Sequence, residues 1–434
     1  MKKDFFQFLV AIFLFLLPWQ TIWITHEQFL NRSKWQYGTL GFYATEILLW
    51  MCIGLFIVWY WRKKNQIQKV KIFSWSRDRL FLFSVLLFSL FSFASILWSS
   101  NRQIALQHSL HIIEGLLLFF VVYLGPINRE SVTKWFLLGA TLQSILGIYQ
   151  FLTQSTFAFK WLGLVAHPVV EAGTSVIVSD GVGRVMRAYG AFTHPNVFGG
   201  YLVVSIICTS FLILKEQKKQ FLYKLFQVAC LTLQLLALFF TFSRSAWIAT
   251  LLFFIGVFIF CIKNKLKETC KIILLSFFLC VPFFVHYFPL VQTRVVHQSS
   301  HEIQSTEERV TGYKDALQIW KTSPFFGVGS GNFTVALYKI NPIHPGYTYQ
   351  PVHNVPLLFL SEFGIAGIVL LFGVIVTFYR VAVQVSSPKY QILFLTGIFF
   401  VLSLFDHYFY SSYLGLLLGA VYFAFIFRFS LNKE

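Results

Sequence analysis

Charged residues are scarce in this chain. Only 12% of its 434 residues are Asp, Glu, Lys or Arg, whereas 57% are apolar. Many apolar runs approach or exceed the ~20 residues with which a helix crosses the ~30 Å hydrocarbon core of a bilayer. The composition therefore predicts a protein with many membrane spans, for which length does not give a count of soluble domains.

Cysteine is also rare, and several familiar signatures are missing. The long polar segment 291–352 contains no cysteine, which excludes a disulfide framework and a zinc-binding cysteine spacing there. The chain has no HExxH motif, no nucleophile elbow and no convincing internal repeat. These absences argue against a zinc protease, a hydrolase of the GxSxG type and a repeat protein.

Acidic residues number 17 against 35 basic ones, so the formal net charge is +18. The Lys and Arg residues fall mostly in short connectors between apolar runs, where they set topology and meet anionic lipids rather than nucleic acid. Their distribution predicts a multi-pass membrane protein with both termini in the cytoplasm. No small-residue cleavage site follows the first apolar run, so we expect a retained first span.

We predict an all-α fold with about twelve spans. The spans cover 5–24, 40–61, 80–98, 104–124, 132–152, 194–214, 222–241, 244–262, 271–290, 354–379, 390–407 and 411–428. This divides the chain into helices 1–5 (1–152), an extracytoplasmic loop (153–193), helices 6–9 (194–290), a large extracytoplasmic loop (291–353), and helices 10–12 with a cytoplasmic tail (354–434). In the large loop we expect an amphipathic helix from Glu307 to Trp320, whose apolar face would comprise Val310, Tyr313, Ala316, Leu317 and Trp320.

His353 and Asn354 lie where the large polar loop enters an apolar helix. Pro356 suits the first turn of that helix, where its missing N–H costs little. The positive end of the helix dipole disfavours an extra proton on a nearby imidazole, so His353 should be neutral and able to accept a proton. The alternative is a capped helix whose His and Asn only bond the backbone.

Three arginines in predicted outer segments are candidate binding residues: Arg187, Arg244 and Arg309. Arg244 is in a tight turn between two spans, where an arginine is costly unless it snorkels or pairs. Guanidinium groups suit planar, bidentate recognition of phosphate oxygens. The alternatives are an interfacial anchor beside Trp247 for Arg244, an ordinary loop charge for Arg187, and balancing of Arg309 by the glutamates before it.

Glu362 lies about two turns inside the helix that begins near His353. A carboxylate there needs a partner, and we expect an arginine or a polar network, with structural pairing favoured over catalysis. Asp406 and His407 lie at the outer end of the predicted eleventh span, within reach of the same surface.

Two further glutamates, Glu46 and Glu114, lie inside predicted spans, and His111 is one turn from Glu114. An internal hydrogen bond is the expected arrangement for the His111–Glu114 pair. Buried carboxylates also fit a transporter, since such proteins often bind ions near the membrane midplane.

Residues 187–367 resemble the O-antigen ligase and O-antigen polymerase superfamily of bacterial membranes. The strongest match is His353-Asn354, a nine-residue spacer and Gly364-x-x-Gly367. This resembles the ligase signature of His, then Asn, Ser or Gln, nine residues, and Gly-x-x-Gly, Thr or Tyr. Further matches follow in order: Arg187 before Gly190 and Pro195-Asn196, then Ser243-Arg244-Ser245, then Pro324 with Gly327-Val328-Gly329-x-Gly331-Asn332-Phe333.

The resemblance implies a GT-C-type glycosyltransferase that works without a metal or other cofactor. It would move a glycan, with inversion, from an undecaprenyl-diphosphate carrier to a hydroxyl of a glycolipid, polysaccharide or protein acceptor at the outer face. By resemblance Arg187 and Arg244 hold the diphosphate and His353 acts at the acceptor. Arg309 and Asn354 are further expected binding residues, and Asn196, Glu362 and Asp406 are expected supports.

Within the enzyme class the His-Asn-x9-Gly spacing favours a ligase over a polymerase or a protein O-glycosyltransferase. A lipid-linked glycan transporter is the rival from another class, and Glu46, Glu114 and Glu362 keep it open. The gathering of the other site residues at one face favours an enzyme. A scaffold protein would explain the spans but not the spacing.

Overall fold

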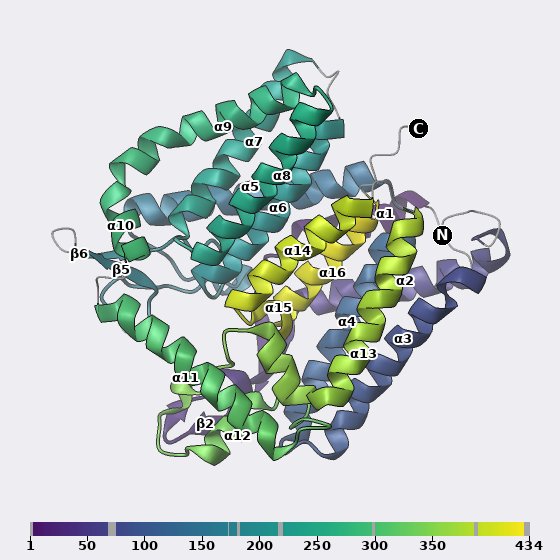
Figure 1. The fold of residues 1–434 in the computed structure, drawn as a ribbon, viewed down its shortest axis with the longest axis vertical. Helices are drawn as coiled ribbons and strands as arrows, with labels where there is room; N and C mark the ends of the chain where they lie inside the picture. Colours follow the sequence, from purple (N-terminus) through teal and green to yellow (C-terminus); the bar gives the residue numbers. More distant parts are fainter. Residues whose placement is uncertain are drawn as a thin grey trace. The chain divides into compact units, whose positions relative to one another are not determined.

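The structure is a computed structural model that describes residues 3–67, 75–171, 173–179, 183–215, 220–296, 300–385 and 389–428. The protein is mostly helical (Figure 1), as its apolar composition predicts. Residues 1–2 and 429–434, on which the prediction of cytoplasmic termini falls, lie outside the described residues. The chain divides into two compact units, one of 1–6, 22–126 and 308–434 and the other of 7–21 and 127–307.

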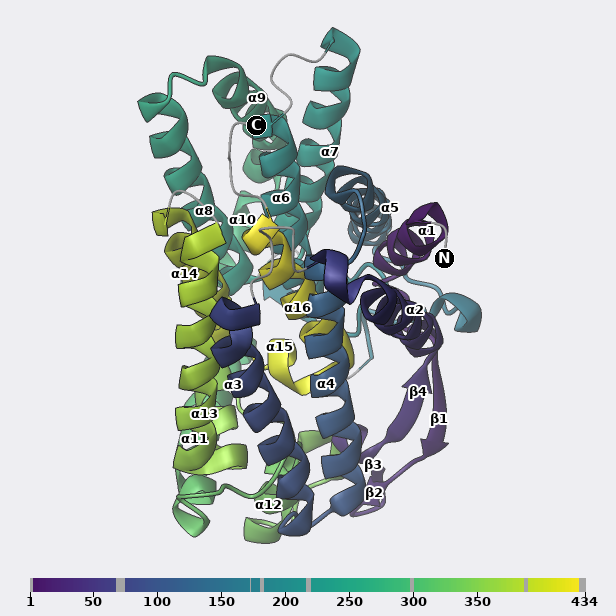
Figure 2. The same ribbon diagram turned by 90° about the vertical axis from the view of Figure 1, so that its right-hand side faces the viewer.

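The first unit contains the C-terminal helices and three helices from the N-terminal part. Helix α16 packs along α4, and α13 packs against α3 and α14 (Figure 2). The helices are α2 (Ala44–Ile67), α3 (Trp75–Ala94), α4 (Arg102–Leu124), most of α11 (Ser300–Thr322), α12 (Phe333–Ile340), α13 (Val355–Val385), α14 (Lys389–Phe405), α15 (Tyr408–Ser411) and α16 (Tyr413–Arg428).

Short strands and 3-10 turns complete this unit. Strand β1 (Ile22–His26) pairs antiparallel with β4 (Leu40–Tyr43), and β2 (Phe29–Leu30) pairs with β3 (Ser33–Lys34). The 3-10 turns are η1 (Gln36–Gly38), η2 (Ser95–Leu97) and η4 (Gly346–Thr348).

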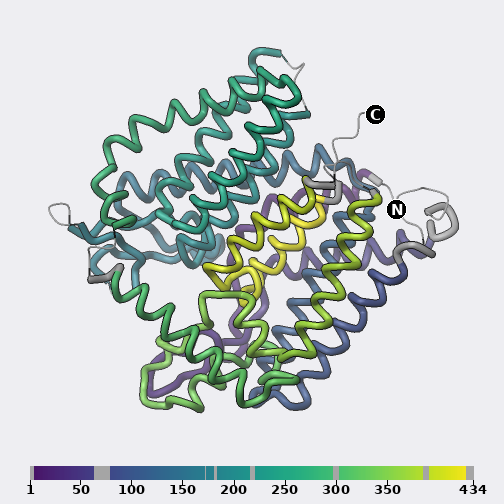
Figure 3. Tube along the Cα trace, viewed as in Figure 1, coloured from purple at the N-terminus to yellow at the C-terminus, as the bar shows by residue number. Residues whose placement is uncertain are grey.

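The second unit is a bundle in which α7 packs against α5, α6 and α9 (Figure 3). Its helices are most of α1 (Lys3–Phe15), α5 (Arg129–Thr153), α6 (Pro195–Lys215), α7 (Phe221–Phe240), α8 (Arg244–Lys263), α9 (Lys267–His286) and α10 (Phe288–Val296), with the 3-10 turn η3 (Lys160–Leu162). Strands β5 (Val176–Ser179) and β6 (Gly183–Met186) form an antiparallel hairpin beside α10. The sequence did not predict this hairpin within 153–193.

Nine helices of the described residues are long and apolar enough to cross a membrane, by length and composition. Three shorter apolar helices cover Asp4–Phe15, Gln391–Phe405 and Tyr413–Ile426. Each of the twelve predicted spans coincides with one of these helices, and most ends agree within a few residues. The count of twelve spans itself stays a prediction.

The first predicted helix, 5–24, is wrong in its second half. Helix α1 ends at Phe15, a turn follows, and strand β1 begins at Ile22. Pro18 has no N–H to donate and disfavours helix in the residue before it, which ends the helical run. The β-branched and aromatic residues of β1 then favour a strand that can pair with β4.

The predicted amphipathic helix exists as α11, but it is longer than expected and its buried face is displaced. Ala316 and Ile319 are buried, whereas Val310 and Leu317 are exposed. Ala316 and Ile319 join Phe333, Phe359 and other residues in an apolar core that also includes Phe363 and Tyr410. This core holds α11, α12 and the start of α13 together.

Candidate active site

His353 lies at a bend directly before α13, in a half-buried position. Its ring is in edge-to-face contact with the ring of His407, with centroids 5.0 Å apart. One ligand-type atom from each of His353, Asp406 and His407 lies within 4.8 Å of the others. The structure therefore brings together two residues from the segment between α14 and α15 and the histidine that precedes α13.

Asn354 and Pro356 build the helix start that positions His353. The Asn354 Oδ1 accepts a hydrogen bond from Leu357 N at 2.9 Å, which is the usual bond of an N-cap residue. Its Nδ2 donates to Leu404 O at 3.1 Å, near the end of α14, where helix carbonyls lack partners. Pro356 is the second residue of α13, as expected. The amide of Asn354 thus fastens the start of α13 to the end of α14.

His407 is buried, and its surroundings keep it neutral. Its Nδ1 lies 2.6 Å from Ser411 Oγ, and its backbone N donates to Asp406 Oδ1 at 2.8 Å. Burial lowers the pKa of His407 from 6.5 to about 4. The nearby carboxylate of Asp406 acts to raise this pKa, whereas His353 lowers it further. The Tyr37 ring contacts His407 edge-on at 5.9 Å. A neutral His407 leaves Asp406 as the acidic group of the cluster.

Glu362 is paired with a polar network and not with an arginine. Its Oε2 accepts from Gly331 N at 2.7 Å and from the Tyr410 hydroxyl at 2.5 Å. Its Oε1 accepts from Phe333 N at 3.2 Å. The side chain is buried, so these three donors compensate a carboxylate that has left water. Glu362 thereby holds the glycine-rich segment 327–333 against α13.

The same segment is joined to α13 by main-chain hydrogen bonds at a break in the helix. Gly364 has φ 62° and ψ −164°, which interrupts the helical path. In an unbroken helix the carbonyls of Ser361 and Glu362 would accept from residues four positions later. Here Ser361 O accepts from Val328 N at 3.0 Å and Glu362 O from Gly329 N at 2.8 Å.

The amides released by the break are satisfied by the same segment. Ile365 N donates to Pro324 O and Ala366 N donates to Phe325 O, both at 2.9 Å. The break therefore exchanges two intrahelical hydrogen bonds for four bonds with segment 324–329. No peptide group of this exchange is left unsatisfied inside an apolar helix, where that would be costly.

The Gly-x-x-Gly pair of α13 follows from this geometry. A Cβ at Gly364 would lie 2.5 Å from the backbone of Phe325, and its positive φ also favours glycine. A Cβ at Gly367 would lie 2.2 Å from the Phe363 Cβ. Both glycines are required because the break places other atoms where their side chains would start.

In the second unit, Arg187 is buried and organises the turn before α8. Its Nε donates to Thr241 O at 2.6 Å, its NH1 to Ser175 Oγ at 2.8 Å and its NH2 to Asn196 Oδ1 at 2.6 Å. The structure thus brings together Arg187 and Asn196, which the sequence analysis placed in one motif. The guanidinium therefore links the residue before β5, the start of α6 and the turn between α7 and α8.

Arg244 begins α8 and lies beside an arginine that the sequence analysis missed. Arg244 NH1 donates to Arg294 O at 3.4 Å, and Arg294 Nε donates to Phe242 O at 3.0 Å. Arg294 is buried, whereas Arg244 is half-buried. Arg294 follows a predicted span by only four residues, and that position at an expected membrane boundary could have identified it.

Arg309, the remaining predicted binding residue, lies partly exposed on α11. No hydrogen bond or ion pair joins it to His353 within the described residues.

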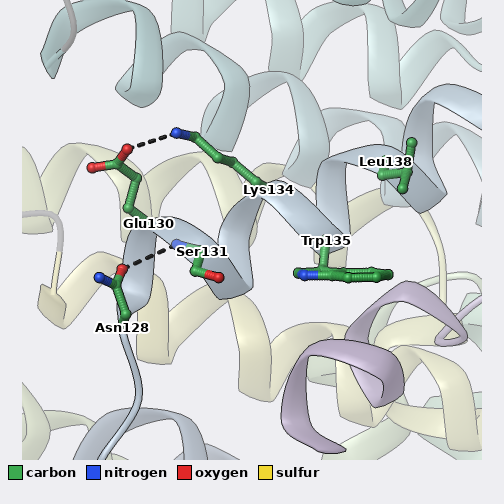
Figure 4. Close-up of a pocket in the computed structure, with 6 residues that line it drawn as sticks. All are labelled: Asn128, Glu130, Ser131, Lys134, Trp135 and Leu138. Atoms are coloured by element: carbon green, nitrogen blue, oxygen red, sulfur yellow. Dashed lines mark hydrogen bonds and ion pairs between the residues drawn. The ribbon is translucent and has the colours of Figure 1, made fainter. Parts of the chain in front are cut away.

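Two groups of side chains could hold a metal ion among the described residues. One is His353, Asp406 and His407, and the other is Glu46, His111 and Glu114. A separate open pocket lies at the start of α5 and is lined by Asn128, Glu130, Ser131, Lys134, Trp135 and Leu138 (Figure 4). There Asn128 caps α5 and Lys134 pairs with Glu130 at 2.6 Å. This pocket contains none of the predicted site residues.

Residues 228–372 match the family described as O-antigen ligase. The matched region includes Arg244, Arg294, His353 and Glu362, whereas Arg187 and Asp406 lie outside it. The curated proteins contain no match to the chain. The match supports a membrane glycosyl-transfer function at the level of the family. It confirms the predicted resemblance for this region, and together with the apolar helices it indicates a polytopic bacterial membrane protein.

Proposed function

We propose that this protein is an inverting, metal-independent glycosyltransferase of the ligase type. It moves a glycan from an undecaprenyl-diphosphate carrier to a hydroxyl of a glycolipid, polysaccharide or protein at the outer face of the cytoplasmic membrane. The observation that carries the proposal is the placement of His353, a residue of the O-antigen ligase region, at a helix start beside Asp406 and His407.

His353 acts as the general base in this proposal. It takes the proton of the acceptor hydroxyl while the acceptor oxygen bonds to the anomeric carbon and the bond from that carbon to the diphosphate breaks. The carboxylate of Asp406 stabilises the imidazolium that forms, in the way that a triad aspartate supports its histidine. A positioned base of this kind contributes about 10²–10⁴ in rate, or about 3–5 kcal/mol of barrier.

The arginines stabilise the leaving group. Negative charge grows on the lipid diphosphate as the glycosidic bond breaks, and fixed cations in a low-dielectric setting lower the energy of that charge. We assign contact with the diphosphate to Arg244, which is half-buried, and support to Arg187 and Arg294, whose Nε atoms bond the backbone of the α7–α8 turn.

Transfer in reconstituted membranes tests the proposal. The wild type and the variants His353→Ala and Arg244→Ala receive an undecaprenyl-diphosphate-linked glycan and separate acceptors, and transfer is measured promptly after EDTA is added. The matched controls are His26→Ala and Arg184→Ala, which change exposed residues. We expect transfer in the wild type and in both controls, and its loss in His353→Ala and Arg244→Ala at equal protein levels.

Other results would contradict parts of the proposal. Full activity in His353→Ala would remove the base assignment. Loss of wild-type transfer on prompt EDTA addition would mean that the reaction needs a metal, for which His353, Asp406 and His407 offer ligands. Movement of the lipid-linked glycan across the bilayer, without transfer to any acceptor, would favour the transporter. The identity of the acceptor that is modified would distinguish a ligase from a polymerase and from a protein O-glycosyltransferase.

A further inference from the structure

A second cluster of ionisable side chains lies in the first unit, on helices that the transfer reaction does not use. Glu46 is in the first turn of α2, and His111 and Glu114 are one turn apart on α4. All three residues are buried, and one ligand-type atom from each lies within 4.8 Å of the others. Both helices are long and apolar enough to span a membrane.

The cluster contains two carboxyl groups and only one imidazole. Glu46 Oε1 accepts from Tyr43 N at 2.8 Å and lies 3.7 Å from His111 Nε2. Glu114 Oε1 accepts from the Trp50 indole N–H at 2.7 Å. In the part of the chain that the structure describes, neither carboxylate has a lysine or arginine partner. With both carboxyl groups ionised, the group would keep a net negative charge even with a protonated imidazole, which is costly in an apolar helix pair.

One oxygen of the cluster has no hydrogen-bond donor. Glu114 Oε2 is fully buried and without a partner among the described residues, and the whole residue is 2% exposed. Buried polar atoms are nearly always satisfied, and an exception calls for an explanation such as a bound ion. The unpartnered Glu114 Oε2 is an observation separate from the charges of the cluster, and it too indicates a bound cation.

We propose that Glu46, His111 and Glu114 bind one divalent metal ion between α2 and α4. Two carboxylate oxygens and one imidazole nitrogen form a donor set that suits Zn²⁺ or Mn²⁺. Metal bonds of about 2.0–2.2 Å require the ligand atoms to close in by about 1 Å or less.

The surroundings are arranged to orient these ligands. The Trp50 indole and the Tyr43 amide each fix one carboxylate, which is the role of outer hydrogen-bond partners in metal sites. The Tyr413 ring lies 5.0 Å from the His111 ring and stacks on Tyr43 at 4.6 Å, so aromatic groups cover the cluster. The ion would neutralise the carboxylates and clamp α2 to α4, using none of the residues assigned to transfer.

Metal analysis of the full-length protein in detergent tests this site without an activity assay. The protein is stripped by prolonged dialysis against chelator, equilibrated with Zn²⁺ or Mn²⁺, freed of excess metal, and analysed by mass spectrometry for its metal content. We expect about one ion per chain in the wild type and a background level in Glu114→Gln. The double variant His353→Ala/His407→Ala should keep its ion, because it alters the other cluster.

Two measurements on the wild type keep the test valid if Glu114→Gln does not fold. Co²⁺ should bind with the visible spectrum of nitrogen and oxygen ligation, and the melting temperature should rise with metal concentration, because a ligand of the folded state stabilises it. Wild-type protein that retains no metal would overturn the proposal. So would metal that is lost in the His353/His407 variant, or metal that a folded Glu114→Gln retains.

Discussion

The amide of Gly327 lies where a side chain on Gly364 would begin. A Cβ at Gly364 would come within 2.7 Å of the Gly327 nitrogen, and a Cβ at Gly327 would come within 2.3 Å of the Glu362 carbonyl. The two backbones are therefore in direct contact, and this contact carries the hydrogen-bond exchange at the break in α13. The helix start that presents His353 lies about three turns before this break on the same helix.

Gly364→Ala should destabilise the protein strongly. Alanine at φ 62° and ψ −164° adds about 1–3 kcal/mol of backbone strain, and the clash with Phe325 adds to that. We expect a melting temperature lower by several degrees and reduced transfer. Gly373→Ala is the matched control on the same helix, because nothing lies within 4 Å of a Cβ there. Equal melting temperatures for the two variants would contradict the packing argument.

Glu362→Gln should destabilise more than Tyr410→Phe. The amide of glutamine offers one acceptor oxygen to three donors and turns an N–H₂ group toward a backbone N–H or the Tyr410 hydroxyl. Leaving a buried polar group unsatisfied costs about 1–3 kcal/mol, whereas Tyr410→Phe removes one hydrogen bond. Thermal unfolding in detergent measures both, with the exposed Glu307→Gln as control. A larger loss in Tyr410→Phe would mean that the tyrosine and not the carboxylate holds the segment.

Arg294→Lys should impair use of the lipid donor even though it keeps the positive charge. A lysine cannot reproduce the planar Nε–H that bonds Phe242 O, so the turn that presents Arg244 loses its support. We expect kcat/KM for the donor to fall about tenfold or more, which corresponds to about 1.4 kcal/mol, with little change for the acceptor. Arg184→Lys serves as the control. An unchanged donor dependence would show that Arg294 has no part in donor binding.

Stability should fall as the pH drops from 7.5 to 5.5, in part because of His407. Its pKa is about 4 in the folded protein, so the unfolded chain, with a pKa near 6.5, takes up a proton first. The stabilisation is complete above pH 6.5 and is lost as the pH falls toward 4, by about 1 kcal/mol at pH 5.5. Melting curves of the wild type and His407→Asn across this range measure the effect. Parallel pH profiles for the two proteins would contradict it.

Most helices were predictable because apolar length dominates in this chain. Runs such as 104–124 and 222–241 have the length of a span and end at polar or charged residues, and the structure places α4 and α7 there. The prediction for the first run, 5–24, was wrong because it treated the apolar residues beyond Pro18 as helix. The short strands of 153–193 were not predicted, since four-residue strands without regular alternation give no periodic signal.

The site was predictable in its residue types but not in its connections. His353 and Asp406 were identified, and the structure places them together. The partners of Glu362 are two backbone amides and a tyrosine, and the two amides have no signature in the sequence. Asn354, expected to bind substrate, uses its amide to cap α13 and reach α14, while its binding role stays a prediction. Arg294 escaped notice because it falls in a polar loop without a motif.

The exchange of hydrogen bonds at Gly364 also bears on how α13 is assembled. The segment Pro324–Gly329 is synthesised before α13, and it supplies the partners that Ser361, Glu362, Ile365 and Ala366 lack at the break. Without that segment, the lowest-energy path for these peptide groups in lipid is to bond one another as a continuous helix. The bend in α13 is thus a property that the helix acquires on docking. An isolated α13 peptide in micelles would be straight, and the preceding loop would act as the template that bends it.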